Sequence, residues 1–152
     1  MTVDYIVASL PPLEFGVPPA IDEERFAQLA GGHIAAEMAK WRELETELRN
    51  AMAVARGKAK DARPAKGCSL YWRQRITACF QEKDIAKRDE LLDKVWWDAA
   101  GELVPPSAPL GKGALAAYGV RLAIACKRAR ISPAAGADAF DALTAGSKLD
   151  FN

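Results

Sequence analysis

A long helical pattern over residues 34–56 constrains the fold more than any other feature of this sequence. Apolar side chains recur there at spacings of three and four residues, at Ile34, Met38, Trp41, Leu44 or Leu48, Met52 and Ala55. Charged residues mostly occupy the remaining faces, so the spacing predicts an amphipathic helix of about six turns. A helix with one apolar face must bury that face against other elements.

Shorter helices are predicted on both sides of this one. Asp22 can cap a helix that ends at Gly31-Gly32. Residues 69–82 form a weaker helix, and a stronger pattern runs from Ile85 to Leu103. Nothing between these last two stretches forces a break, so they can form one continuous rod.

Two further helices are expected in the C-terminal part of the chain. Residues 114–129 are nearly all apolar on one side, and basic residues follow at their end, where positive charge suits the helix dipole. Ser132-Pro133 is a cap followed by a first-turn proline, which predicts a short last helix through Phe140 and Leu143.

No alternation typical of a β-strand persists beyond the first segment. We therefore expect one all-α domain over residues 1–152, with about five to six helices in antiparallel hairpins. Its other parts are a short extended or helical N-terminal segment (1–21), an exposed, mobile basic loop (56–67), a Pro/Gly-rich connection (104–113) and a loose tail (144–152). Leu70 and Ile85 are expected to point inward.

The N-terminal segment is unusually apolar for a chain terminus. Ile6 and Leu10 are expected to pack inside the chain, and Pro11, Pro12 and Phe15 are expected to form an exposed corner. A stiff segment that contains prolines loses little conformational entropy on docking. Extension of the segment into a groove of a partner therefore stays open as an alternative.

Composition favours a soluble cytoplasmic protein. The chain has 152 residues, with 21 basic and 20 acidic side chains and a net charge of +1, a balance that disfavours a dedicated nucleic-acid binder. Cys68, Cys79 and Cys126 fit free thiols in a reducing compartment. No secretory signal is visible, and the most apolar stretch, 114–126, is interrupted by Arg121 and is shorter than a membrane span.

Groups for catalysis are scarce in the sequence. His33 is the only histidine, which excludes a histidine triad or a histidine-rich metal site. His33 and Glu37 lie one turn apart, and we interpret them as a polar pair near a helix start. The Gly-Lys-Gly at 111–113 lacks the spacing of a phosphate-binding loop. We expect no active site, no cofactor, no metal and no small-molecule substrate.

The basic loop is the clearest electrostatic feature. It carries five positive side chains against Asp61 alone, namely Arg56, Lys58, Lys60, Arg63 and Lys66. Such a loop can bind nucleic acid or anionic lipid headgroups. It has no interleaved aromatic residue for base stacking, so a simple solvated loop is the other interpretation.

Trp96 and Trp97 are adjacent, about 100° apart on a helix. Both cannot point into one small core. One of the two is expected at the edge of the core or against a partner.

Several stretches, in order along nearly the whole chain, resemble one family: small bacterial proteins encoded within V/A-type ATPase operons. These stretches are YIVASLPPLEFG (5–16), AIDEERFAQL (20–29), LETELRNAMAVARG (44–57), LLDKVWWDAAGEL (91–103) and ALAAYGVRLAIACKRARISPAAGADAFDAL (114–143). Two features depart from the family pattern: Trp96-Trp97 stands where an Arg-Trp pair is expected, and the 104–112 connection is unusually rich in Pro and Ala.

The resemblance implies a non-catalytic subunit or assembly factor of a rotary ATPase. Its expected role is that of a C/d-like collar or central-stalk protein, which links the soluble head to the membrane rotor and lies at the cytoplasmic side of the inner membrane. The expected contacts with partner subunits are Leu10, Pro11, Phe15, Arg49, Trp97 and Arg121. The alternative is an adaptor that binds nucleic acid or an anionic membrane through residues 56–66.

Overall fold

The computed structural model describes residues 1–63, 67 and 69–131. Within that part the chain forms helices and no strand, so the all-α prediction is confirmed. The elements are α1 (Val3–Ser9), α2 (Glu23–Ala30), α3 (Ala35–Ala55), the 3-10 turn η1 (Ala59–Asp61), α4 (Leu70–Cys79), α5 (Ile85–Ala99), the 3-10 turn η2 (Ala100–Leu103) and α6 (Lys112–Arg130). The last helix expected after Ser132 and the tail 144–152 lie outside the described residues.

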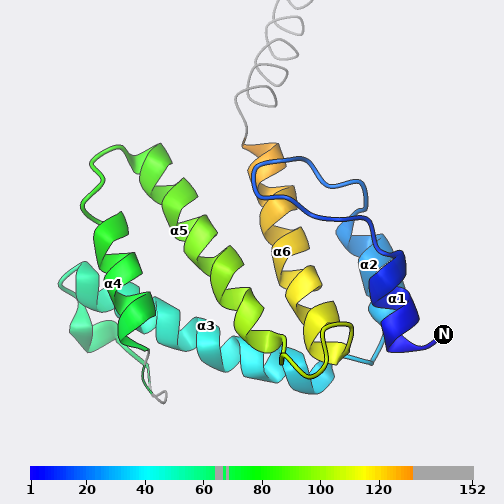
Figure 1. Cartoon of the computed structure of the whole chain (residues 1–152). Helices are drawn as coiled ribbons and strands as arrows, with labels where there is room; N and C mark the ends of the chain where they lie inside the picture. Colours follow the sequence, from blue (N-terminus) through cyan, green and yellow to red (C-terminus); the bar gives the residue numbers. More distant parts are fainter. Residues whose placement is uncertain (64–66, 68, 132–152) are drawn as a thin grey trace, which may run out of the picture.

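The long helix α3 lies across one end of the molecule (Figure 1). Helices α4, α5 and α6 stand on it side by side and alternate in direction, and α1 and α2 flank α6. The predicted helix over 34–56 thus forms the base of the fold. None of the described helices is both long and apolar enough to cross a membrane.

One part of the core lies between α3, α4, α5 and α6. Trp41 and Leu48, two turns apart on α3, are buried there. Ile76 of α4 and Val95 of α5 meet them from the other side. Burying side chains of this size stabilises the fold by about 1.5–3 kcal/mol each, which explains how a base helix with charged outer faces is held in place.

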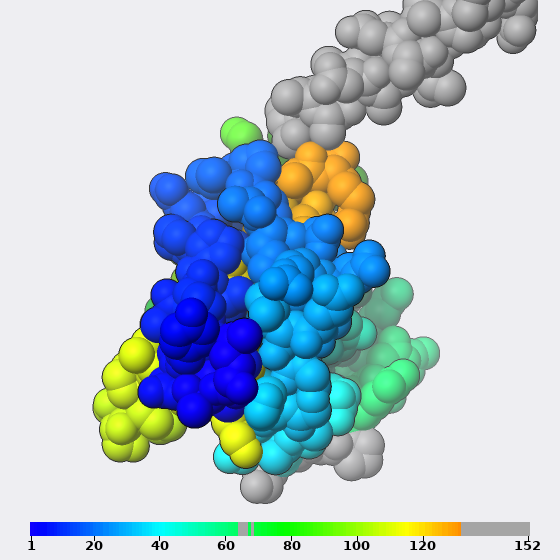
Figure 2. All heavy atoms as spheres, turned by 90° about the vertical axis from the view of Figure 1, so that its right-hand side faces the viewer, coloured from blue at the N-terminus to red at the C-terminus, as the bar shows by residue number. Residues whose placement is uncertain are grey.

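A second part of the core lies on the opposite side of α6. Leu115 and Leu122 of α6 are completely buried there, together with Ile6 of α1 and Phe26 of α2. Figure 2 shows the N-terminal segment and α2 covering this side of the molecule. Because α6 contributes to both parts of the core, its sequence is apolar around most of its circumference.

Helices α4 and α5 are separate, so the prediction of one continuous rod is wrong. Asp84 caps α5, since its carboxylate accepts hydrogen bonds from the backbone N–H groups of Ala86 (2.9 Å) and Lys87 (3.2 Å). The guanidinium of Arg88 donates two hydrogen bonds to the carbonyl of Glu82, at 3.1 and 2.8 Å. These contacts stabilise a tight turn and fold α5 back against α4.

Leu70 and Ile85 do not point inward as expected. They are the first residues of α4 and α5, and they are 60% and 78% exposed. The core-facing positions begin two residues later on α4, at Trp72, and seven residues later on α5, at Leu92. An apolar residue in the first turn of a helix can thus continue the helical spacing and still lie beyond the edge of the core.

The apolar N-terminal segment packs inside its own chain. Ile6 and Leu10 are 2% and 9% exposed, as expected. The hydroxyl of Tyr118 on α6 donates a hydrogen bond to the Pro11 carbonyl at 2.5 Å. Phe15 is half-buried, and its ring meets that of Trp97 edge-on with centroids 5.6 Å apart. The expected exposed corner is therefore limited to Pro12, because Phe15 is held against α5.

Candidate functional site

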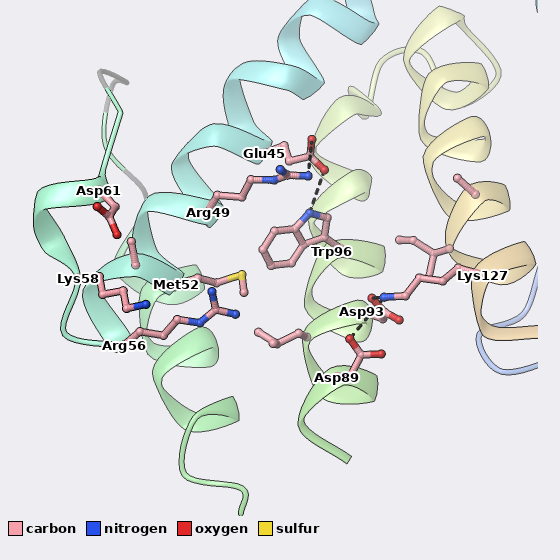
Figure 3. A pocket seen from close by; sticks show the side chains of 14 residues that line it. Glu45, Arg49, Met52, Arg56, Lys58, Asp61, Asp89, Asp93, Trp96 and Lys127 are labelled. Carbon is pink, nitrogen blue, oxygen red and sulfur yellow. Dashed lines mark hydrogen bonds and ion pairs between the residues drawn. The ribbon is translucent and has the colours of Figure 1, made fainter. Parts of the chain in front are cut away.

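A groove of about 650 Å³ opens between the C-terminal half of α3, α5 and α6 (Figure 3). Its apolar surface comes from Met52 of α3, Leu92 and Trp96 of α5, and Ile124 of α6. Charged side chains border this surface on both sides. Apolar surface framed by polar groups is typical of a binding site.

Trp96 is fixed in the wall of the groove by its indole N–H, which donates to Glu45 Oε2 at 3.2 Å. Glu45 Oε1 in turn lies 3.6 Å from a guanidinium nitrogen of Arg49. Trp97 is 8% exposed and belongs to the core. The half-exposed tryptophan of the pair is therefore Trp96, which corrects the expectation that Trp97 contacts a partner.

The wall formed by α5 and α6 carries four paired charges. Lys127 Nζ lies 2.8 Å from Asp93 and 3.5 Å from Asp89. Arg128 Nη1 lies 2.9 Å from Asp89 and 3.1 Å from Asp93. Asp93 and Arg128 are only 13% and 18% exposed at their side chains. This network neutralises its own charges and ties α5 to α6, so it presents little net charge to the groove.

The opposite wall carries cations without a nearby acid. Arg56 lies over the ring of Phe80, 5.4 Å from the centroid, a cation–π contact that leaves its charge uncompensated. Lys58 is exposed. In the described part of the chain, neither side chain has a carboxylate within ion-pair distance. This end of the groove is therefore positive, although Asp61 also borders it.

The basic loop is exposed over its described residues, but it is tied to α3. The Asn50 side chain accepts a hydrogen bond from the Arg63 backbone N–H at 2.8 Å and donates one to the Arg63 carbonyl at 2.7 Å. These two bonds and η1 set the position of Lys58 and Lys60. Arg42 and Arg49 line a hollow together with Arg63, and Lys66 lies outside the described residues.

The residues expected to contact a partner do not form one surface. Leu10 is buried in the core, and Pro11 is half-buried beneath Tyr118. Arg121 is half-buried over the Trp97 ring, 5.7 Å from its centroid, and donates to the Trp97 carbonyl at 3.0 Å. Burial lowers the pKa of Arg121, an effect that the charge of Asp98 opposes.

Phe15, Trp97 and Arg121 thus lie together, joined by Lys94 above the Phe15 ring. This cluster holds the N-terminal segment to α5 and α6. Of the six expected contacts, only Arg49 lines the groove.

Most of the candidate catalytic and metal-binding side chains lie in the described part of the chain. No group of three His, Cys, Asp or Glu side chains that could hold a metal occurs among them. His33 is exposed in the turn before α3. Burial raises the pKa of the thiols of Cys79 and Cys126, so both are weak nucleophiles at neutral pH. The remaining cysteine, Cys68, lies outside the described residues.

The groove itself was not predicted from the sequence. Glu45, Arg49, Met52 and Arg56 recur at spacings of three and four residues along α3, and this spacing is the signal that could have indicated it. Comparison of the chain with family models, with curated proteins and with solved structures gave no match.

Proposed function

We propose that this chain is a non-catalytic subunit or assembly factor of a V/A-type rotary ATPase. In this role it occupies a central-stalk or collar position, on the cytoplasmic side of the membrane and peripheral to it. It acts by packing against other subunits, and it holds position without chemistry of its own.

The α3–α5–α6 groove is the observation that carries the docking part of this proposal. Its lining includes Met52 and Trp96, which are only partly buried, next to the buried Leu92 and Ile124. Accessible apolar surface rimmed by polar groups typically marks an interaction site. The ordered resemblance of five stretches to proteins from ATPase operons supports the choice of the machine.

Affinity purification from the native cells tests the proposal. The tagged chain is solubilised in mild detergent, and co-purifying proteins are quantified by mass spectrometry. We expect ATPase subunits at a fixed ratio to the bait. A matched bait with Ala123→Glu, which places a charged side chain at an exposed position in the groove, should lose them. Recovery of no ATPase subunit from membranes that contain the intact enzyme would rule the proposal out.

A second candidate function is an adaptor that binds nucleic acid or an anionic membrane through residues 56–66. The two hydrogen bonds between Asn50 and Arg63 favour it, because they hold Arg63 against α3, where it lines a hollow with Arg42 and Arg49. Binding of this kind weakens steeply as salt rises. We expect a Lys58→Glu/Lys60→Glu variant to lose such binding with unchanged helical content. Equal binding by the variant would exclude this function.

A further inference from the structure

The walls of the α3–α5–α6 groove are long enough to hold another α-helix. Its α3 wall is formed by Glu45, Arg49, Met52, Ala53 and Arg56, which follow one another at spacings that keep them on one face of the helix. Eleven residues of helix rise by about 16 Å, or three turns. A three-turn wall fits a rod-shaped ligand better than a compact one.

Helices α5 and α6 form the other walls of the groove. On α5, Asp89, Leu92, Asp93 and Trp96 face the groove at the same kind of spacing. On α6, Ala123 is exposed beside Ile124. Packed helices place their axes 8–10 Å apart, with ridges of one in the grooves of its neighbours. Another helix seated here would pack against α3 and α5 and bury the exposed part of Met52 and Trp96.

The charges select the kind of helix. The α5–α6 wall is internally paired through Asp93 and Lys127. The α3 side ends in Arg56 and Lys58, which have no acidic partner in the described part. A complementary ligand therefore has an apolar face bordered by carboxylates.

A single-stranded nucleic acid fits less well. Among the described residues that line the groove, Trp96 is the one aromatic side chain, whereas single strands are bound by stacking successive bases on several aromatic side chains.

We propose that this groove binds an acidic amphipathic α-helix of a partner protein, anchored by apolar side chains at i, i+3 or i+4, and i+7. The inference rests on the docking role proposed above, but it holds whether or not the partner is an ATPase subunit. Arg56 and Lys58 select the acidic edge of the helix, and Met52, Leu92 and Ile124 receive its anchors.

The test uses the full chain and a defined probe. The probe is an 18-residue fluorescein-labelled peptide with leucines along one helical face and glutamates beside them, and binding is measured by fluorescence anisotropy at low salt. Two controls are a peptide of equal composition with the leucines spread around the helix, and one with lysine in place of glutamate. We expect only the first peptide to bind.

Charge-reversal variants then locate the site. Arg56→Glu/Lys58→Glu should weaken binding about tenfold or more, because two attractions become repulsions. The matched variant Lys87→Glu/Lys112→Glu, at exposed positions outside the groove lining, should bind normally. Ala123→Glu should also weaken binding. Equal binding by all three variants would overturn the proposal, and circular dichroism of each verifies folding.

Competition identifies other occupants. A synthetic peptide of residues 132–152 that displaces the probe at equal or lower concentration would assign the groove to the chain's own C-terminal segment and overturn a partner helix. If a single-stranded oligonucleotide binds more tightly than the probe peptide, and Arg56→Glu/Lys58→Glu abolishes that binding, the proposal of a partner helix is also overturned. If the probe peptide does not bind but ATPase subunits co-purify, only the proposal that the groove binds an acidic helix is refuted. If the probe peptide binds but no ATPase subunit co-purifies, only the proposed role in the ATPase is refuted.

Discussion

Substitution of Gly113 by Ala is expected to destabilise the protein, although Ala normally favours a helix over Gly by about 1 kcal/mol. Gly113 lies in the first turn of α6, where η2 approaches closely. A Cβ at this position would lie 1.9 Å from the backbone carbonyl oxygen of Leu103, and real Cβ contacts are essentially never shorter than 3.0 Å. The two backbones would therefore have to separate by at least about 1 Å.

The obstacle is backbone, so no side-chain rotation relieves it. Pro105 Cδ, at 3.1 Å from the same Cβ position, restricts movement further. Overpacking of this kind typically costs 1–3 kcal/mol and occasionally more. Because the obstacle is backbone, we expect a cost of about 3 kcal/mol, and a net loss of about 2 kcal/mol after the gain in helix propensity. A chain of this length should then melt roughly 4–8 °C lower.

Urea and thermal unfolding followed by far-ultraviolet circular dichroism measure this change. Gly32→Ala is the matched control, since a Cβ at Gly32 meets nothing within 4 Å, and it should alter the midpoint by little. If Gly113→Ala unfolded at the same or a higher temperature than the natural chain, the close approach of η2 to α6 would be wrong. The propensity gain alone predicts that opposite sign.

Further predictions concern the N-terminal segment and the cysteines. Tyr118→Phe leaves the carbonyl of Pro11 without its hydrogen bond, so it should cost about 1 kcal/mol and speed hydrogen exchange in α1; unchanged exchange would contradict this contact. Arg121→Ala should lower the free energy of unfolding and leave binding of the acidic probe peptide unchanged, because Arg121 is a packing residue outside the groove. Weaker peptide binding with unchanged stability would show that Arg121 acts in binding and not in packing. Cys126 should react with a thiol reagent before Cys79, as located by peptide mass spectrometry. Both thiols have a raised pKa, but Cys79 is more deeply buried; faster labelling of Cys79 in the folded chain would refute its burial.

Local sequence patterns were sufficient to predict those features that depend on a single helix. The α3 pattern, the Asp22 cap and the apolar side of α6 were all predicted close to their observed positions. The break between α4 and α5 was missed because the apolar spacing continues across it. Asp84 is a good capping residue, yet the sequence does not show that the Arg88 side chain reaches back to Glu82 and stabilises the turn.

Long-range contacts explain the remaining differences. Phe15 is separated from Trp97 by more than eighty residues, and nothing local to either residue predicts that their rings meet. Similarly, helical geometry requires Trp96 and Trp97 to face different directions, but the sequence does not show that Phe15 and Arg121 pack against Trp97. Of the candidate partner residues, Leu10, Phe15, Trp97 and Arg121 take part in the packing of the chain itself.

The apolar stripe of α3 explains why the groove was not predicted from the sequence although the helix itself was. Trp41 and Leu48 face the core, whereas Met52 is only partly buried and borders the groove. In the sequence these residues form one continuous stripe, because neighbouring helix faces overlap at spacings of three and four. The stripe is wider than the helices of the described residues cover. The uncovered part, bordered by Arg49 and Arg56, is the surface on which a partner helix can complete the packing of α3 and α5.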